Sequence, residues 1–72
     1  SPGFQYIFQA QQRLQTPVDK NDKKAKADQE KEAIEFYDMS IQLDPQLAEA
    51  FAGRGKVMLR QNKLAEAGKD FE

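Results

Sequence analysis

A pair of residues in this chain recurs at an interval of 34 positions. Ala33 recurs as Ala67 and Tyr37 recurs as Phe71, so each window places an aromatic ring four residues after an alanine. Pro45 lies between the two windows and separates stretches rich in Ala, Gln, Glu, Lys and Leu, which favour helices. A recurrence of this length with two helical stretches per unit is typical of proteins built from stacked helical hairpins. The expected fold is therefore all-α.

Apolar residues at helical spacing, together with the prolines, define four predicted helices. They cover residues 4–15, 30–44, 47–60 and 64–72, the last one truncated. The spacing of Phe4, Ile7 and Phe8 places them on one face of the first helix, and we expect Thr16-Pro17 to end it. The apolar side of the third helix is expected to contain Leu47, Phe51, Gly55, Met58 and Leu59. A short turn over residues 61–63 should separate the last two helices, since Asn62 tolerates the left-handed conformation.

The stretch over residues 16–29 is dominated by mixed charges. It is interpreted as a solvated linker or as an extension of the following helix, and the sequence leaves open whether residues 18–31 are helix or loop. Asn21-Asp22 is a possible helix start, because both side chains can cap a helix.

Consensus residues at fixed spacing connect the chain with a known family. The segment over residues 51–71 reads Phe51-x2-Arg54-Gly55-x2-Met58 followed by Ala67-x3-Phe71, and the unit before it carries Ala33-x3-Tyr37 and closes with Leu43-Asp44-Pro45. The tetratricopeptide pattern is W-x2-L-G-x2-Y, then A-x3-F, then P, at a 34-residue period. The chain therefore resembles the tetratricopeptide-repeat family, most clearly over residues 32–72.

The resemblance implies a single helical unit over residues 1–72, built as antiparallel helix hairpins stacked into a short right-handed solenoid fragment of about four helices. Gly55 and Ala67 should let paired helices approach closely, and Phe51, Met58 and Phe71 should fill the space around them. The chain departs from the pattern at Arg54, where Leu is usual, at Ser40, where a small apolar residue is usual, and at Gly68. The first unit is irregular, because the charged stretch after Pro17 lengthens it.

Composition argues against several classes of function. The chain contains neither His nor Cys, so it lacks the most frequent general base and metal ligand, and we expect a non-enzyme without metal or cofactor. Paired carboxylates such as Glu32 and Glu35 are interpreted as solvated helix faces. A formal net charge of −1 argues against a nucleic-acid surface. No apolar run approaches the ~18 residues of a membrane span.

The family resemblance implies a non-catalytic protein-interaction scaffold. In such proteins the opening helices of successive units line a groove that receives a peptide or a partner helix. The candidate binding residues in this chain are Glu49, Ala52, Lys56, Leu59 and Arg60. Lys56 and Arg60 lie one helical turn apart and could hold a carboxylate or an acidic peptide, or they could be ordinary solubilising residues.

Other functions remain open at this point. The chain could belong to an organelle-import or chaperone-associated receptor, to a hairpin module that binds helices of membrane-remodelling proteins, or to a purely structural repeat that packs on neighbouring repeats of a longer parent chain. Some family members clamp the carboxyl-terminal peptide of heat-shock chaperones, but Gly53 stands where that clamp has an Asn. The compartment is not evident, and a cytoplasmic-facing one is favoured.

Overall fold

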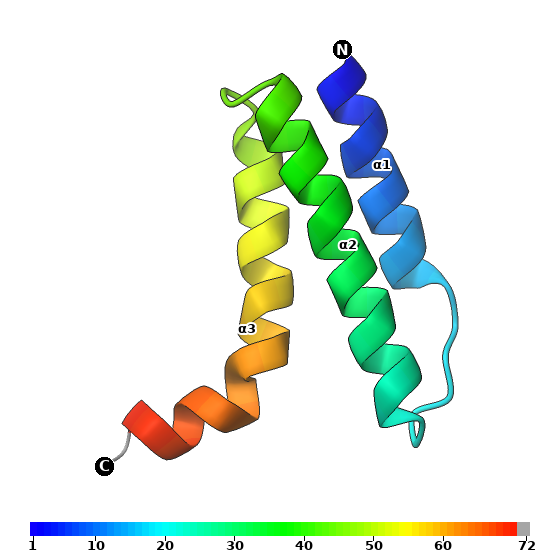
Figure 1. The fold of residues 1–72 in the computed structure, drawn as a ribbon, viewed down its shortest axis with the longest axis vertical. Coiled ribbons are helices and arrows are strands. Elements are labelled where there is room, and N and C mark those ends of the chain that lie inside the picture. Colours follow the sequence, from blue (N-terminus) through cyan, green and yellow to red (C-terminus); the bar gives the residue numbers. More distant parts are fainter. Residues whose placement is uncertain (71–72) are drawn as a thin grey trace.

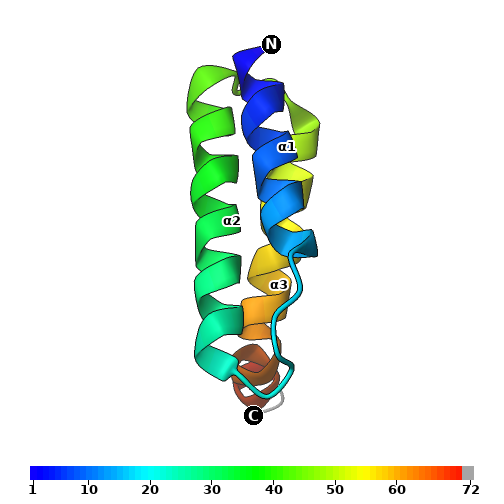
Figure 2. The same ribbon diagram turned by 90° about the vertical axis from the view of Figure 1, so that its right-hand side faces the viewer.

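A computed structural model describes the backbone of residues 1–70 and the side chains of residues 1–62. It contains three helices, α1 (Pro2–Gln15), α2 (Lys23–Leu43) and α3 (Ala48–Asp70), arranged as in Figure 1. Helix α2 packs against both α1 and α3, whereas α1 and α3 touch each other little. Figure 2 shows α2 in one layer and the other two helices in a second layer. The all-α prediction is confirmed, with three helices in the described part of the chain instead of four.

The charged stretch after α1 is partly loop and partly helix. Thr16 leaves the helical region with φ −65° and ψ 123°, as expected for a residue before proline, and the loop runs to Asp22. The Asp22 carboxylate accepts a hydrogen bond from the Ala25 backbone N–H at 2.9 Å, which is a helix N-cap. Helix α2 consequently begins at Lys23 rather than at residue 30, and its first turns carry much of the charge.

Helix α3 runs through the position where a turn was predicted. Its backbone stays helical from Ala48 to Asp70, although the ribbon bends in its orange part in Figure 1. Among the described residues none has a positive φ, so Asn62 does not adopt the left-handed conformation that would end a helix. The separate fourth helix was therefore a wrong prediction for residues 64–70. Phe71 and Glu72 lie outside the described residues, as do the side chains of Ala67 and Gly68, and the part described displays no stacked repeat or solenoid.

The core lies between the two layers and is built largely from small side chains. Its buried apolar members are Ile7, Ala10, Ala33, Tyr37, Ala50 and Val57. Half-buried Leu14, Ile34, Phe36, Ile41 and Leu47 pack around them. Tyr6 of α1 stacks on Phe36 of α2, with ring centroids 6.3 Å apart. Because three core residues are alanines, the helices pack closely and bury few large side chains.

Several large apolar residues on the predicted apolar helix faces are exposed. Phe4 and Phe8 are 46% and 58% exposed, because α1 turns Gly3, Ile7 and Ala10 towards the core. On α3, Phe51, Met58 and Leu59 are 43%, 39% and 73% exposed, because Ala50 and Val57 occupy the packing face. The side of α3 that packs on α2 is therefore rotated about the helix axis, by part of a turn, from the side that was predicted to be apolar.

The close approach of α3 to α2 occurs at Gly53, not at Gly55. A Cβ atom added to Gly53 would lie 2.6 Å from the Tyr37 hydroxyl oxygen and 2.5 Å from ring atom Cε1. A Cβ atom on Gly55 would meet nothing within 4 Å. The prediction that Gly55 allows close packing is corrected: within the described residues, Gly53 has that role.

Polar side chains connect the three helices. The Gln29 amide of α2 donates to the backbone carbonyls of Arg13, at 2.7 Å, and Thr16, at 2.6 Å, and so caps the end of α1. The Arg13 side chain also forms an ion pair with Glu32. On the other side of α2, Arg54 Nη1 lies 2.8 Å from Asp38 Oδ1. The Arg54 residue that departs from the family pattern therefore holds α3 against α2.

Candidate functional site

All five candidate binding residues lie on α3 and all are exposed. An α-helix turns about 100° per residue, so these residues fall within roughly 100° of arc on one side of α3. They are Glu49, Ala52, Lys56, Leu59 and Arg60. The side of α3 that packs on α2, with Ala50, Gly53 and Val57, is adjacent to this arc. We call the five residues the α3 face; the structure places them together and leaves them accessible.

The α3 face combines one large apolar side chain with charged neighbours. Leu59 is 73% exposed, the most exposed of the large apolar residues in the described part of the chain. Glu49, Lys56 and Arg60 supply one negative and two positive charges around it. Such a surface can bury an apolar partner residue on Leu59 and pair a carboxylate with Lys56 or Arg60. It presents no cluster of groups that could activate a nucleophile.

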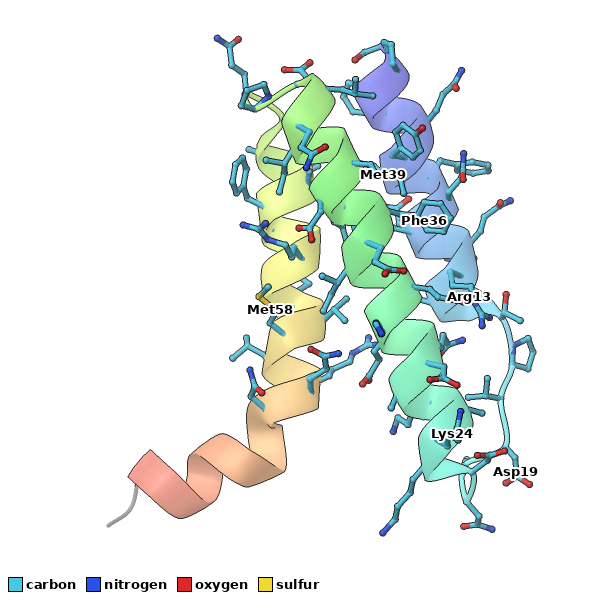
Figure 3. The ribbon with its side chains drawn as sticks, viewed as in Figure 1. Arg13, Asp19, Lys24, Phe36, Met39 and Met58 are labelled. Atoms are coloured by element: carbon cyan, nitrogen blue, oxygen red, sulfur yellow. The ribbon has the colours of Figure 1, made fainter. Side chains whose placement is uncertain are left out.

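The basic end of the α3 face borders a hollow of about 670 Å³. Arg60 and Gln61 line it from α3, and the loop and the first turns of α2 supply the rest of the wall: Lys20, Lys23, Lys26, Ala27 and Glu30. We call this the basic hollow, since four cationic side chains surround it. Figure 3 shows the end of the molecule where the loop with Asp19 joins the start of α2 near Lys24.

Sequence reasoning did not find the three lysines of the basic hollow, because it treated residues 16–29 as a solvated stretch. A local signal was present. The first turn of α2 contains no acidic residue and carries Lys23, Lys24 and Lys26. The positive end of the helix dipole disfavours cations there. Lys56, which was predicted to act with Arg60, does not line the hollow.

Tyr37 connects the core to the basic end of the α3 face. The side chain is 3% exposed, and this burial raises the pKa of the Tyr37 phenol above its ordinary value of 10.0. The positive charge of Arg60 acts in the opposite direction and lowers this pKa.

Neither a metal-binding cluster nor a membrane-spanning helix occurs among the described residues. They contain no group of three or more His, Cys, Asp or Glu residues arranged to hold a metal ion. In the same part of the chain, no helix is both long and apolar enough to cross a membrane. These findings leave the α3 face and the basic hollow as the surfaces with the clearest chemical character.

Comparisons of the chain with protein-family models, with curated proteins and with solved structures found no match.

Proposed function

We propose that this chain is a non-catalytic interaction module of the tetratricopeptide type, which binds a peptide or a partner helix on the α3 face. The observation that carries the proposal is the exposure of all five face residues on one side of α3, beside the surface that packs on α2. Helix α3 is held in place by small residues on its packing side, so its larger and charged side chains remain free for a partner.

The expected binding mode places an apolar partner residue on Leu59. Exposed large apolar side chains in an accessible helix face are frequent anchors of interfaces, and a few such anchors dominate binding energy. Lys56 and Arg60 would then pair with acidic groups on the partner and fix its direction. Glu49, near the other end of the face, disfavours an acidic group there, so the face has a polarity along α3.

The proposal is tested by selecting displayed random peptides against the immobilised 72-residue chain. Selected peptides are then titrated in solution by fluorescence polarisation. Leu59→Ala should weaken binding by more than about 1 kcal/mol, and Lys56→Glu/Arg60→Glu should weaken it further. Both variants change exposed residues, so circular dichroism should show an unchanged helix content.

A matched control is available on α2. Lys24→Glu/Lys31→Glu reverses the same number of charges on exposed residues away from the α3 face. This variant should retain the binding of the wild-type chain. If the selected peptides lose affinity equally in both double variants, or keep full affinity for Leu59→Ala, the α3 face is not the binding site.

A structural role within a longer helical array is a second candidate. Phe51 and Met58 lie on the side of α3 away from the α3 face and expose large apolar surfaces, 43% and 39% of each residue. A further helix packed there would bury them, as in proteins whose repeats stack on each other. This candidate predicts that selection yields no peptide, and that Phe51→Ser/Met58→Ser reduces self-association measured by sedimentation.

A further inference from the structure

We propose that the basic hollow is the receptor for an acidic peptide segment, held through the carboxylates of two or three of its side chains. This inference rests on the proposed function and deepens it, because Arg60 belongs to both the α3 face and the hollow. It assigns the partner a chemical class: a short apolar and acidic peptide whose acidic end enters the hollow.

The first support is the convergence of cations from three separate parts of the chain. Lys20 comes from the loop, Lys23 and Lys26 from the first turn of α2, and Arg60 from α3. Among the described lining residues, Glu30, which is 7% exposed, supplies the one acidic group. Four cations and one carboxylate give this described lining a formal charge of +3. Its volume of about 670 Å³ lies within the range of ligand sites.

The second support is the absence of ion pairs at these cations among the described side chains. Three other basic residues whose side chains the structure describes are paired with carboxylates: Arg13, Lys24 and Arg54. Among the described side chains, no acidic oxygen lies within 4.0 Å of the four cations of the hollow, although acidic residues are close in sequence, and the same is true of Lys31 and Lys56.

Those nearby acidic residues have other partners. Asp19 accepts a hydrogen bond from the Asn21 backbone N–H at 2.8 Å, and Asp22 caps α2 through the Ala25 N–H. Asp28 pairs with Lys24 at 3.1 Å. These three local acids therefore shape the loop and the start of α2, and none of them forms an ion pair with a cation of the hollow.

The third support is that the lysines occupy a position that weakens α2. The first turn of a helix favours acidic side chains because of the helix dipole, and a lysine there opposes it. Lys23 and Lys26 are both in that turn, which contains no acidic residue, although Asp22 caps the helix just before it. When a natural sequence contains residues that lower local stability, those residues are expected to lie at functional sites.

The charge distribution favours a short peptide over a nucleic acid. The whole chain has a formal net charge of −1, so the positive charge of the hollow is confined to a small area. A nucleic acid binds along an extended basic surface that contacts many phosphates. Asp19, Asp22 and Asp28 are interspersed with these lysines in the sequence, so the positive charge does not extend as a continuous basic stretch.

Fluorescence polarisation with labelled probes tests this inference. The first probe is an eight-residue peptide with one Leu followed by Asp and Glu residues, and the second replaces every acid by its amide. A single-stranded thymidine octanucleotide and inorganic polyphosphate serve as competitors. We expect the acidic peptide to bind, with an affinity that falls as salt is added, and the amide peptide to bind at least about tenfold more weakly.

The decisive comparison uses two variants with the same loss of charge. Lys23→Gln/Lys26→Gln should lower the affinity for the acidic peptide about tenfold or more. Lys24→Gln/Lys31→Gln, on the same helix but outside the hollow, should leave this affinity unchanged. Equal losses in both variants, or tighter binding of the octanucleotide or the polyphosphate than of the peptide, would overturn the inference.

The two proposals can fail separately. If selected peptides lack acidic residues and lose affinity with Leu59→Ala but not with Lys23→Gln/Lys26→Gln, the α3 face binds peptides and the hollow has no part in it. If no peptide binds the folded wild-type chain, the proposed function fails as well. Because removing lysines from the first turn of α2 relieves an unfavourable charge, the Lys23→Gln/Lys26→Gln variant should melt at an equal or higher temperature, so lost binding cannot be ascribed to unfolding.

Discussion

Gly53 of α3 lies directly on the ring of Tyr37 in α2, so closely that a methyl group on Gly53 would reach within 2.6 Å of the Tyr37 hydroxyl. Tyr37 is buried and belongs to the core, which leaves its ring little room to move aside. This contact sets how near α3 comes to α2, and it thereby fixes which residues of α3 face outwards.

Gly53→Ala should therefore destabilise the protein. Overpacking of a filled core costs about 1–3 kcal/mol, which exceeds the gain in helix propensity on replacing glycine. Gly55→Ala is the matched control, since a Cβ there meets nothing within 4 Å, and it should stabilise by about 0.5–1 kcal/mol. Urea denaturation followed by circular dichroism measures both. Equal effects of the two substitutions would show that the contact with Tyr37 is not tight.

Ser40 offers a site where the protein can be stabilised. Ser40 is 0% exposed, and its hydroxyl oxygen is the one buried side-chain polar atom without a hydrogen-bond partner among the described residues. Ser40→Ala removes this polar group and should raise the free energy of unfolding by about 1 kcal/mol. Ser40→Thr retains the hydroxyl and adds a methyl group to a filled site, so it should lower stability. A loss of stability in Ser40→Ala, measured by thermal denaturation, would mean that the hydroxyl is bonded.

Gln29 should be important for the position of the loop. Its amide donates hydrogen bonds to two carbonyls at the end of α1. Gln29→Ala would leave both carbonyls without this donor and should lower the free energy of unfolding by about 1–3 kcal/mol. Gln15→Ala, at an exposed position at the end of α1, should change stability by less than about 0.5 kcal/mol. Hydrogen exchange of the amides over residues 12–16 checks the local effect. Unchanged protection in Gln29→Ala would contradict the capping role.

The stability of the protein should fall in alkaline solution because of Tyr37. Burial raises the pKa of the folded-state phenol above 10.0, so the unfolded chain loses this proton first. The contribution of Tyr37 is therefore fully present below pH 10 and is lost as pH rises through the folded-state pKa. Tyr37→Phe removes the titrating group but keeps the ring, and the difference between the two proteins isolates this effect from the lysines. Parallel curves of stability against pH above pH 10 would contradict the assignment.

The sequence predicted the helical regions better than the faces on which they pack. Helical spacing and prolines located all three helices, because a helix is a local structure with local start and end signals. Which side of α3 packs depends on the fit to Tyr37, and that fit selected Ala50, Gly53 and Val57 over the larger Phe51 and Met58. The assumption that the largest apolar residues are buried was wrong for α3, because its close contact with α2 favours small residues.

The candidate site was predictable only in part. The five residues of the α3 face follow from the family resemblance, and the structure shows all five exposed, including Leu59, which was also predicted on the apolar side of this helix. The basic hollow depends on the loop and the start of α2 lying near Arg60, which is thirty or more positions further along the chain. No periodic pattern encodes such proximity. The lysines in the first turn of α2 are the one local sign of it, and mixed charge in a sequence is also typical of a solvated stretch.

The most direct test of the account is to map a selected peptide on the chain by nuclear magnetic resonance. Backbone amide shifts of the ¹⁵N-labelled protein are recorded during titration with the peptide. We expect the largest changes on the α3 face, at Glu49, Ala52, Lys56, Leu59 and Arg60. Changes centred instead on the side of α3 with Phe51 and Met58, or on α1, would contradict it.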